Sequence, residues 1–208
     1  NLRLVGGNIA RGPLALAVSV HGCVPAGRAL LRSGARPGDR IWVSGTLGGA
    51  AAALARGGLA TYRSPEELDE LARRYFLPEA QIGAGAVLRE QASAAIDISD
   101  GLLADAGHLA SASGVQLCLR AAAVPRSAGL LACFDADPAL RLAATGGDDY
   151  ELLFTAPPTA RSTVLAAAQS SDTPVTCIGR IDAQPGLRLL DAAGAPMPNH
   201  FASFDHFA

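Results

Sequence analysis

Two carboxylates and a hydroxyl stand close together where a strand gives way to a helix. Residues 96–102 read Ile-Asp-Ile-Ser-Asp-Gly-Leu. Side chains alternate along a strand, so Asp97 and Ser99 are expected on one face and the two isoleucines on the other. Asp100 would then begin the helix. Carboxylate oxygens suit Mg²⁺, and the first amides of a helix favour a phosphate. The competing interpretation makes Asp100 a simple N-cap, whereas a lone Asp97 inside an apolar strand needs a partner.

A second acidic stretch follows a pair of glycines at residues 146–151, which read Gly-Gly-Asp-Asp-Tyr-Glu. The glycines permit a tight backbone, and a strand is expected to begin at Tyr150. Asp148 and Asp149 cannot both be buried and charged without a cation or hydrogen-bond donors. The alternative is an exposed acidic turn before a strand.

Two weaker patterns could serve phosphate. Gly6 and Gly7 form a turn that lets an anion approach the backbone, although such turns are common. Arg28 and Arg32 would share one face of a helix, and a guanidinium suits phosphate, but both could equally be solvated surface residues. The four histidines show no metal-ligand spacing, and Ser99 has no evident base, so a nucleophilic serine is not predicted.

Composition removes several classes of function. All 17 basic residues are arginine, which excludes a P-loop lysine and a Schiff-base lysine. The net charge is −2 with a pI near 6.1, so no nucleic-acid partner is expected. No 18-residue apolar run exists, and no membrane partner is expected. The four cysteines form no CxxC pair and are read as mostly buried, reduced thiols of a cytoplasmic protein.

The elements that position these residues mix strands and helices without a strict βαβ rhythm. We therefore predict an α+β fold, with helices packed on a mixed sheet. Strands are predicted at residues 4–8, 14–20, 40–45, 93–99, 115–119, 150–155, 175–181 and 187–190. Helices are predicted at residues 48–60, from Pro65, from Pro78, and at 101–113, 138–144 and 159–169.

Taken together, the motifs resemble the thiamine-monophosphate kinase family, of the superfamily that includes aminoimidazole ribonucleotide synthetase and selenophosphate synthetase. The resemblance runs through almost the whole chain in the family's order. It rests on residues 6–13, 27–34, 37–39, 96–105, 146–151, 177–179 and 204–207.

The resemblance implies a fold in two parts. Residues 1–26 would be the end of an aminoimidazole ribonucleotide synthetase-like ATP-binding domain, and residues 27–208 a complete C-terminal α+β domain. It also implies that the chain lacks about a further half-domain before this point. A full-length family member would be a homodimer.

The implied reaction is ATP-dependent phosphorylation of thiamine monophosphate to thiamine diphosphate, by direct transfer with Mg²⁺ and no covalent intermediate. ATP and thiamine monophosphate would be the partners. The resemblance assigns ATP contacts to Gly7, Asn8, Arg32 and Ser99, metal ligation to Asn8, Asp97 and Asp100, and substrate contacts to Asp148 and Phe204.

Two departures weaken the match. Asn8 stands where the family usually has Asp, which keeps an oxygen ligand but loses its charge. Phe204 stands where the family commonly has Tyr. These two departures, together with the half-domain that the resemblance implies is missing, make the activity of this chain doubtful. Two alternative functions therefore stay open. One is a non-catalytic remnant that binds a ligand or another subunit; the other is a different ATP-using synthetase of the superfamily.

Overall fold

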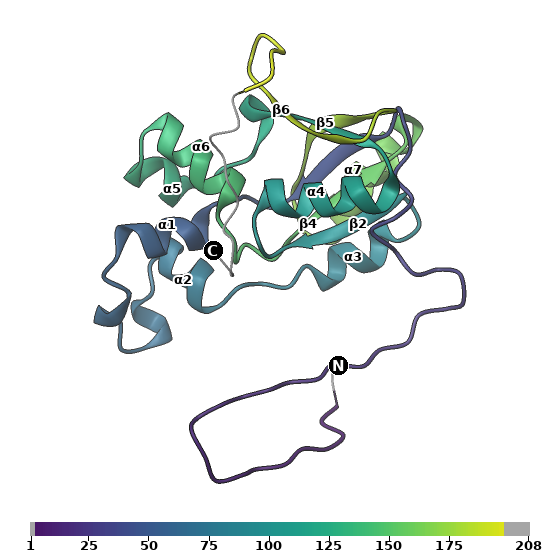
Figure 1. Ribbon diagram of the computed structural model, residues 1–208. Helices are drawn as coiled ribbons and strands as arrows, with labels where there is room; N and C mark the ends of the chain where they lie inside the picture. The colour runs from purple at the N-terminus through teal and green to yellow at the C-terminus, as the bar shows by residue number, and fades with distance from the viewer. Residues whose placement is uncertain (1–2, 198–208) are drawn as a thin grey trace.

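The computed structural model describes residues 3–197 and is built on one six-stranded sheet (Figure 1). The spatial order is β2-β4-β1-β5-β3-β6. The β3–β6 pair is parallel, and the other four pairs are antiparallel. The strands are β1 (Arg40–Ser44), β2 (Ala94–Ile98), β3 (Gln116–Arg120), β4 (Glu151–Ala156), β5 (Val175–Asp182) and β6 (Gly186–Leu190).

Helices cover both faces of this sheet, which confirms the predicted α+β class with a mixed sheet. They are α1 (Gly49–Arg56), α2 (Glu70–Phe76), α3 (Ile82–Leu88), α4 (Leu102–Ser113), α5 (Ala128–Cys133), α6 (Ala136–Thr145) and α7 (Arg161–Ser170). On one face, Ile41, Val43 and Leu153 pack in the main core with residues of α1, α4 and α6. On the other, Trp42 and Phe154 pack against α3 and α7.

The alternation of side chains along β2 is as predicted. Ala94, Ile96 and Ile98 are buried in the main core, whereas Asp97 is exposed. The strand therefore carries an acidic side chain to the surface at the end where it leaves the sheet.

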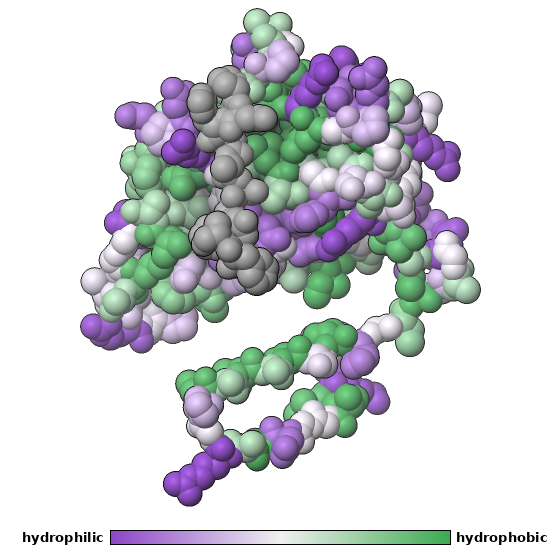
Figure 2. Space-filling view, in the orientation of Figure 1, coloured by the Kyte–Doolittle hydropathy of each residue, from purple (hydrophilic) through white to green (hydrophobic). Residues whose placement is uncertain are grey.

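The predicted strand at residues 14–20 is wrong for this chain. Its alternating apolar side chains are almost fully exposed, and the segment forms no ladder within the described residues. A strand persists only when a neighbour satisfies its amides and carbonyls and covers its apolar side chains. The segment before β1 extends away from the rest of the structure (Figure 1). Apolar residues are exposed along it (Figure 2). The short strand predicted at residues 4–8 is likewise absent.

Smaller differences concern helix bounds and cysteines. The helix predicted from Pro65 is a short 3-10 turn followed by α2, and α3 begins four residues after Pro78. Helix α5 was not predicted. Only Cys118 is buried, so the expectation of mostly buried thiols is wrong, although all four cysteines are free. Among the described residues, no helix is long and apolar enough to cross a membrane.

Candidate functional site

The loop between β2 and α4 carries Ser99 and Asp100 and is shaped by Gly101. This glycine has φ 112° and ψ 152°, a conformation that other residues rarely adopt. A Cβ at this position would lie 2.8 Å from the carbonyl carbon and oxygen of Thr145. Glycine therefore lets the loop pack directly against the chain that leaves α6.

The two acidic motifs are joined by backbone hydrogen bonds. The Asp148 amide donates to the Ser99 carbonyl at 2.9 Å, and the Tyr150 amide donates to the Ile98 carbonyl at 2.8 Å. Just before Asp148, a Cβ on Gly147 would lie 2.4 Å from the Ser99 carbonyl oxygen, so this approach also requires glycine. The structure thus brings Asp148 beside the loop that carries Ser99 and Asp100.

The backbone around Asp148 is strained. Asp148 has φ 64° and Tyr150 has φ 52°, both in the left-handed region. Such a conformation costs about 1–2 kcal/mol per non-glycine residue. The Tyr150 hydroxyl donates to Asp148 Oδ1 at 3.1 Å. The strain and the hydrogen bond together fix the Asp148 carboxylate toward solvent.

The electrostatics show that the carboxylates converge. The pKa of Tyr150 is raised, first by its hydrogen bond to Asp148, then by burial and by the charges of Asp148, Asp97 and Asp100. Three carboxylates that act on one phenol make a region favourable to a cation. The chemistry of this donor set fits Mg²⁺.

Asp105 is the residue that sequence reasoning left out of the site. Its Oδ2 accepts hydrogen bonds from the amides of both Ser99 and Asp100, each at 3.0 Å. Burial raises the pKa of Asp105, its bonds to these amides lower it, and the charges of Asp100 and Asp97 raise it further. The sequence offered one indication of this role, because Asp105 is an acidic residue in the first turn of the helix that follows Ser99-Asp100-Gly101.

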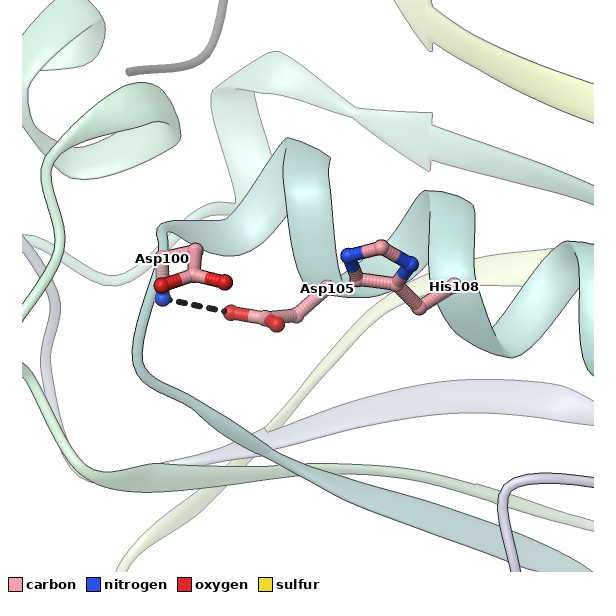
Figure 3. A group of neighbouring side chains, drawn as sticks. All are labelled: Asp100, Asp105 and His108. Carbon is pink, nitrogen blue, oxygen red and sulfur yellow. Dashed lines mark hydrogen bonds between the residues drawn. The ribbon is translucent and has the colours of Figure 1, made fainter. Parts of the chain in front are cut away.

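The interpretation of Asp100 as a simple N-cap is wrong. The cap position belongs to Gly101, and no side chain there accepts a capping hydrogen bond. The Asp100 carboxylate also lies close to His108. Ligand atoms of Asp100, Asp105 and His108 all lie within 4.8 Å of one another (Figure 3). His108 stands one helical turn after Asp105 and is a further possible metal ligand that sequence spacing did not reveal.

The second acidic stretch is not simply an exposed turn. Asp148 is exposed, but Asp149 and Glu151 are buried. Both Asp149 oxygens accept from the Gly48 amide, at 2.9 and 3.0 Å, just before α1. Burial raises the pKa of Asp149 to about 7, against the effect of that amide.

Glu151 has its own partners in the interior. Its Oε2 accepts from the Ser44 hydroxyl at 2.5 Å, and Arg74 lies 3.4 Å from its other oxygen. Burial is the main cause of its raised pKa. Asp149 and Glu151 therefore join the strands to α1 and α2, and Asp148 is the one exposed acid of the three in this stretch.

Two hollows meet at Asp148. One, of about 610 Å³, lies between α1 and the loops, with Ser99, Asp100 and Gly147 on one side and apolar side chains such as Leu54 on the other. The second, of about 620 Å³, is lined by polar side chains that include Arg74 and Thr46. Volumes of this size suit small metabolites.

Other predicted site residues lie elsewhere. Gly7 and Asn8 are exposed in the extended segment before β1 and are not brought to the acidic cluster (Figure 1). The Arg32 carbonyl accepts from the Ser113 hydroxyl, at the far end of α4 from Asp100. A 12-residue helix spans about 18 Å, so Arg32 lies well away from the loop. Phe204 lies outside the described residues, and the roles assigned to all four stay predictions.

Comparison with known proteins shows the family to which the chain belongs. The family model for AIR synthase related protein, C-terminal domain, matches residues 36–192. Thiamine-monophosphate kinase from Salmonella typhimurium is 41% identical over all of this chain. The chain spans about 64% of the length of that relative.

Solved structures give the same result. Thiamine-monophosphate kinase from Stenotrophomonas maltophilia superposes with a TM-score of 0.76 at 41% identity, over 84% of this chain and 56% of that one. A structure described as AaThiL complexed with AMPPCP and TMP has a TM-score of 0.63 at 33% identity, over 81% of this chain and 52% of that one.

Proposed function

Since the chain belongs to the AIR synthase related family through its C-terminal domain, we propose that it is the larger part of a thiamine-monophosphate kinase. The reaction would be ATP-dependent phosphorylation of thiamine monophosphate to thiamine diphosphate. The observation that supports this most is the pair of hydrogen bonds that set Asp148 beside Ser99 and Asp100.

Each residue of the cluster has a role in the proposal. Asp97 and Asp100 would hold Mg²⁺, with Ser99 in contact with ATP. Bound Mg²⁺ would neutralise phosphate charge as the terminal phosphoryl group moves to the substrate phosphate. Asp148, held by the Tyr150 hydroxyl, would contact thiamine monophosphate. Since positioning and charge neutralisation do most of the catalysis in such transfers, no nucleophilic side chain is required.

The proposal for the whole protein also includes Gly7, Asn8 and Arg32 as nucleotide contacts, Asn8 as a further metal ligand, and Phe204 at the substrate. A cytoplasmic homodimer is part of the same proposal. Because Gly7 and Asn8 stand away from the acidic cluster here, we expect this chain alone to turn over slowly or not at all.

Metal binding tests the site directly. Calorimetric titration with Mn²⁺ should show a site that is weakened at least tenfold in Asp97→Asn and in Asp100→Asn. Asp137→Asn removes an exposed acid in α6 and serves as the matched control. Equal affinity in all four proteins would exclude the cluster as the metal site.

Activity is tested by coupled ADP release with Mg²⁺ and thiamine monophosphate. Any release that depends on thiamine monophosphate and is lost in Asp97→Asn supports the kinase. Binding of an ATP analogue without turnover would favour a ligand-binding remnant. ADP release with a different phosphate acceptor would favour another synthetase of the superfamily.

A further inference from the structure

A third hollow lies on the opposite half of the sheet, over β1, β5 and β3. Its volume is about 930 Å³, and it shares no lining residue with the two hollows at the acidic site. Four arginines line it: Arg40, Arg120, Arg161 and Arg180. This is a local concentration of positive charge on a chain whose net charge is −2.

The strand register places two of these arginines directly opposite each other. Arg40 of β1 pairs with Arg180 of β5, so both side chains stand on the same face. Like charges opposite each other across a strand pair destabilise a sheet. Helices α3 and α7 cover the neighbouring part of this face, where they pack with Trp42 and Phe154. Arg40 and Arg180 stay exposed beside this cover, and Arg161 is the first residue of α7.

Three of the four guanidinium groups are held by contacts within the chain. Arg180 Nε lies 3.0 Å from Asp182, and Arg120 donates to the Cys177 carbonyl at 3.1 Å. Arg161 lies over the Trp42 ring, 5.7 Å from its centroid. These contacts orient the charges before any ligand arrives.

Arg40 differs from the other three. Within residues 3–197, its side chain makes no hydrogen bond and no ion pair. The lining holds one carboxylate, that of Asp191. Burial raises the pKa of the Cys118 thiol to about 11, so this thiol is neutral and adds no negative charge. With Asp182 included, the four arginines exceed the acids by two charges.

We propose that this hollow binds a small phosphorylated anion that carries at least two phosphate groups. A guanidinium group can donate two parallel, charge-assisted hydrogen bonds to the oxygens of one phosphate. An anion between Arg40 and Arg180 would also reduce the repulsion between their two positive charges. Trp42 is 2% exposed, with Phe154 stacked beside it and Arg161 over its ring, so no aromatic face is free for a base. Recognition therefore falls on the phosphates rather than on a nucleoside.

Trp42 makes the test simple because it is the only tryptophan and lines the hollow. Its fluorescence is followed while the full chain is titrated with inorganic tripolyphosphate, pyrophosphate or ADP. EDTA is present throughout, so that no Mg²⁺-dependent binding at the acidic cluster contributes. All three anions should give saturable changes, and calorimetry should give the same affinities.

Single charge removals locate the site. Arg40→Gln should weaken tripolyphosphate binding about tenfold, as expected for the loss of one charge-assisted contact. Arg141→Gln removes an exposed arginine on α6, away from the lining, and should bind as the unmodified chain does.

Three results would overturn the proposal. The first is the absence of saturable binding by both methods. The second is equal weakening by Arg40→Gln and Arg141→Gln, which would show attraction to overall charge alone. The third is binding of ADP without binding of pyrophosphate or tripolyphosphate, which would show recognition of the nucleoside.

Discussion

The Asp105 carboxylate holds the site loop by accepting two backbone amides with one oxygen. Replacement by alanine leaves the amides of Ser99 and Asp100 without that partner. We expect Asp105→Ala to lower the free energy of unfolding by about 1–3 kcal/mol and to weaken Mn²⁺ binding. Both quantities are measured by chemical denaturation and calorimetry.

Asp105→Asn is the matched comparison, because its amide oxygen can take the place of Oδ2 in both bonds. Desolvation already disfavours the charge of Asp105, so loss of that charge should cost little. If Asn destabilises the chain as much as Ala does, the charge of Asp105 and not its acceptor oxygen is what matters.

Asp149 should make stability depend on pH. Its pKa is about 7 in the folded chain, and an unfolded Asp titrates near 3.9, so the folded state binds more protons between these values. Stability is therefore greatest at the acidic end of this window and falls as pH rises through about 7, by about 2–4 kcal/mol.

The measurement compares thermal unfolding of the unmodified chain and Asp149→Asn from pH 5 to 8, in EDTA. The variant should show a flatter profile, whatever constant offset the substitution adds. Parallel profiles would mean that Asp149 is ionised in the folded state throughout this range.

For single side chains, the sequence predicted which residues face outward from a strand but not which acids are buried by partners from other elements. Strand alternation was sufficient to place Asp97 outward. It could not reveal how Asp149 and Glu151 are buried, because their donors, Gly48 and Ser44, lie about a hundred residues earlier in the chain. The order of polar and apolar residues along a strand cannot predict hydrogen-bond partners that belong to another element.

Among the elements, the contact between the two acidic motifs depends on Gly147. Gly147→Ala would place a Cβ 2.4 Å from the Ser99 carbonyl oxygen, so one of the two loops must move. We expect a loss of about 1–3 kcal/mol in the free energy of unfolding, together with weaker Mn²⁺ binding.

Gly107→Ala provides the control within α4, since nothing lies within 4 Å of the position that the new methyl group would take. Alanine favours a helix interior by about 0.5–1 kcal/mol over glycine, so this variant should gain stability. A Gly147→Ala variant as stable as Gly107→Ala would show that the motifs are not packed as described.

All six strands of the sheet were predicted at nearly their observed positions, because each is a short, largely apolar segment with turn residues near its ends. The strand at residues 14–20 has the same pattern and fails. A pattern of apolar residues indicates that a segment can form a strand, but the strand forms only when a neighbouring strand is present to share hydrogen bonds with it. Helix α5 was missed because its six residues are too few for a clear period.

At the scale of the whole molecule, exposure divides the chain into a protected body and an open segment. Side chains from residue 3 to 24 are exposed, whereas the body contains the cores on both faces of the sheet. Brief trypsin treatment should therefore cut after Arg11 before it cuts within the body, because proteases act on locally unfolded backbone.

Mass spectrometry of the first products checks this expectation. Cleavage at Arg40, or at Arg141 within α6, before cleavage at Arg11 would show that residues 3–24 are covered in solution. The order of strands in space could not be predicted in advance, since no local pattern specifies which distant strands become neighbours.

The position of β1 has a consequence for how the protein is made. This strand is the first of the six in the chain, yet it lies between β4 and β5, whose residues begin more than a hundred positions later. During translation, Ile41 and Val43 therefore stay exposed in the nascent chain until β4 and β5 have been synthesised. Non-local pairing of this kind folds slowly and leaves apolar strands open to aggregation. Chaperone demand during synthesis should accordingly fall only once residue 182 has emerged.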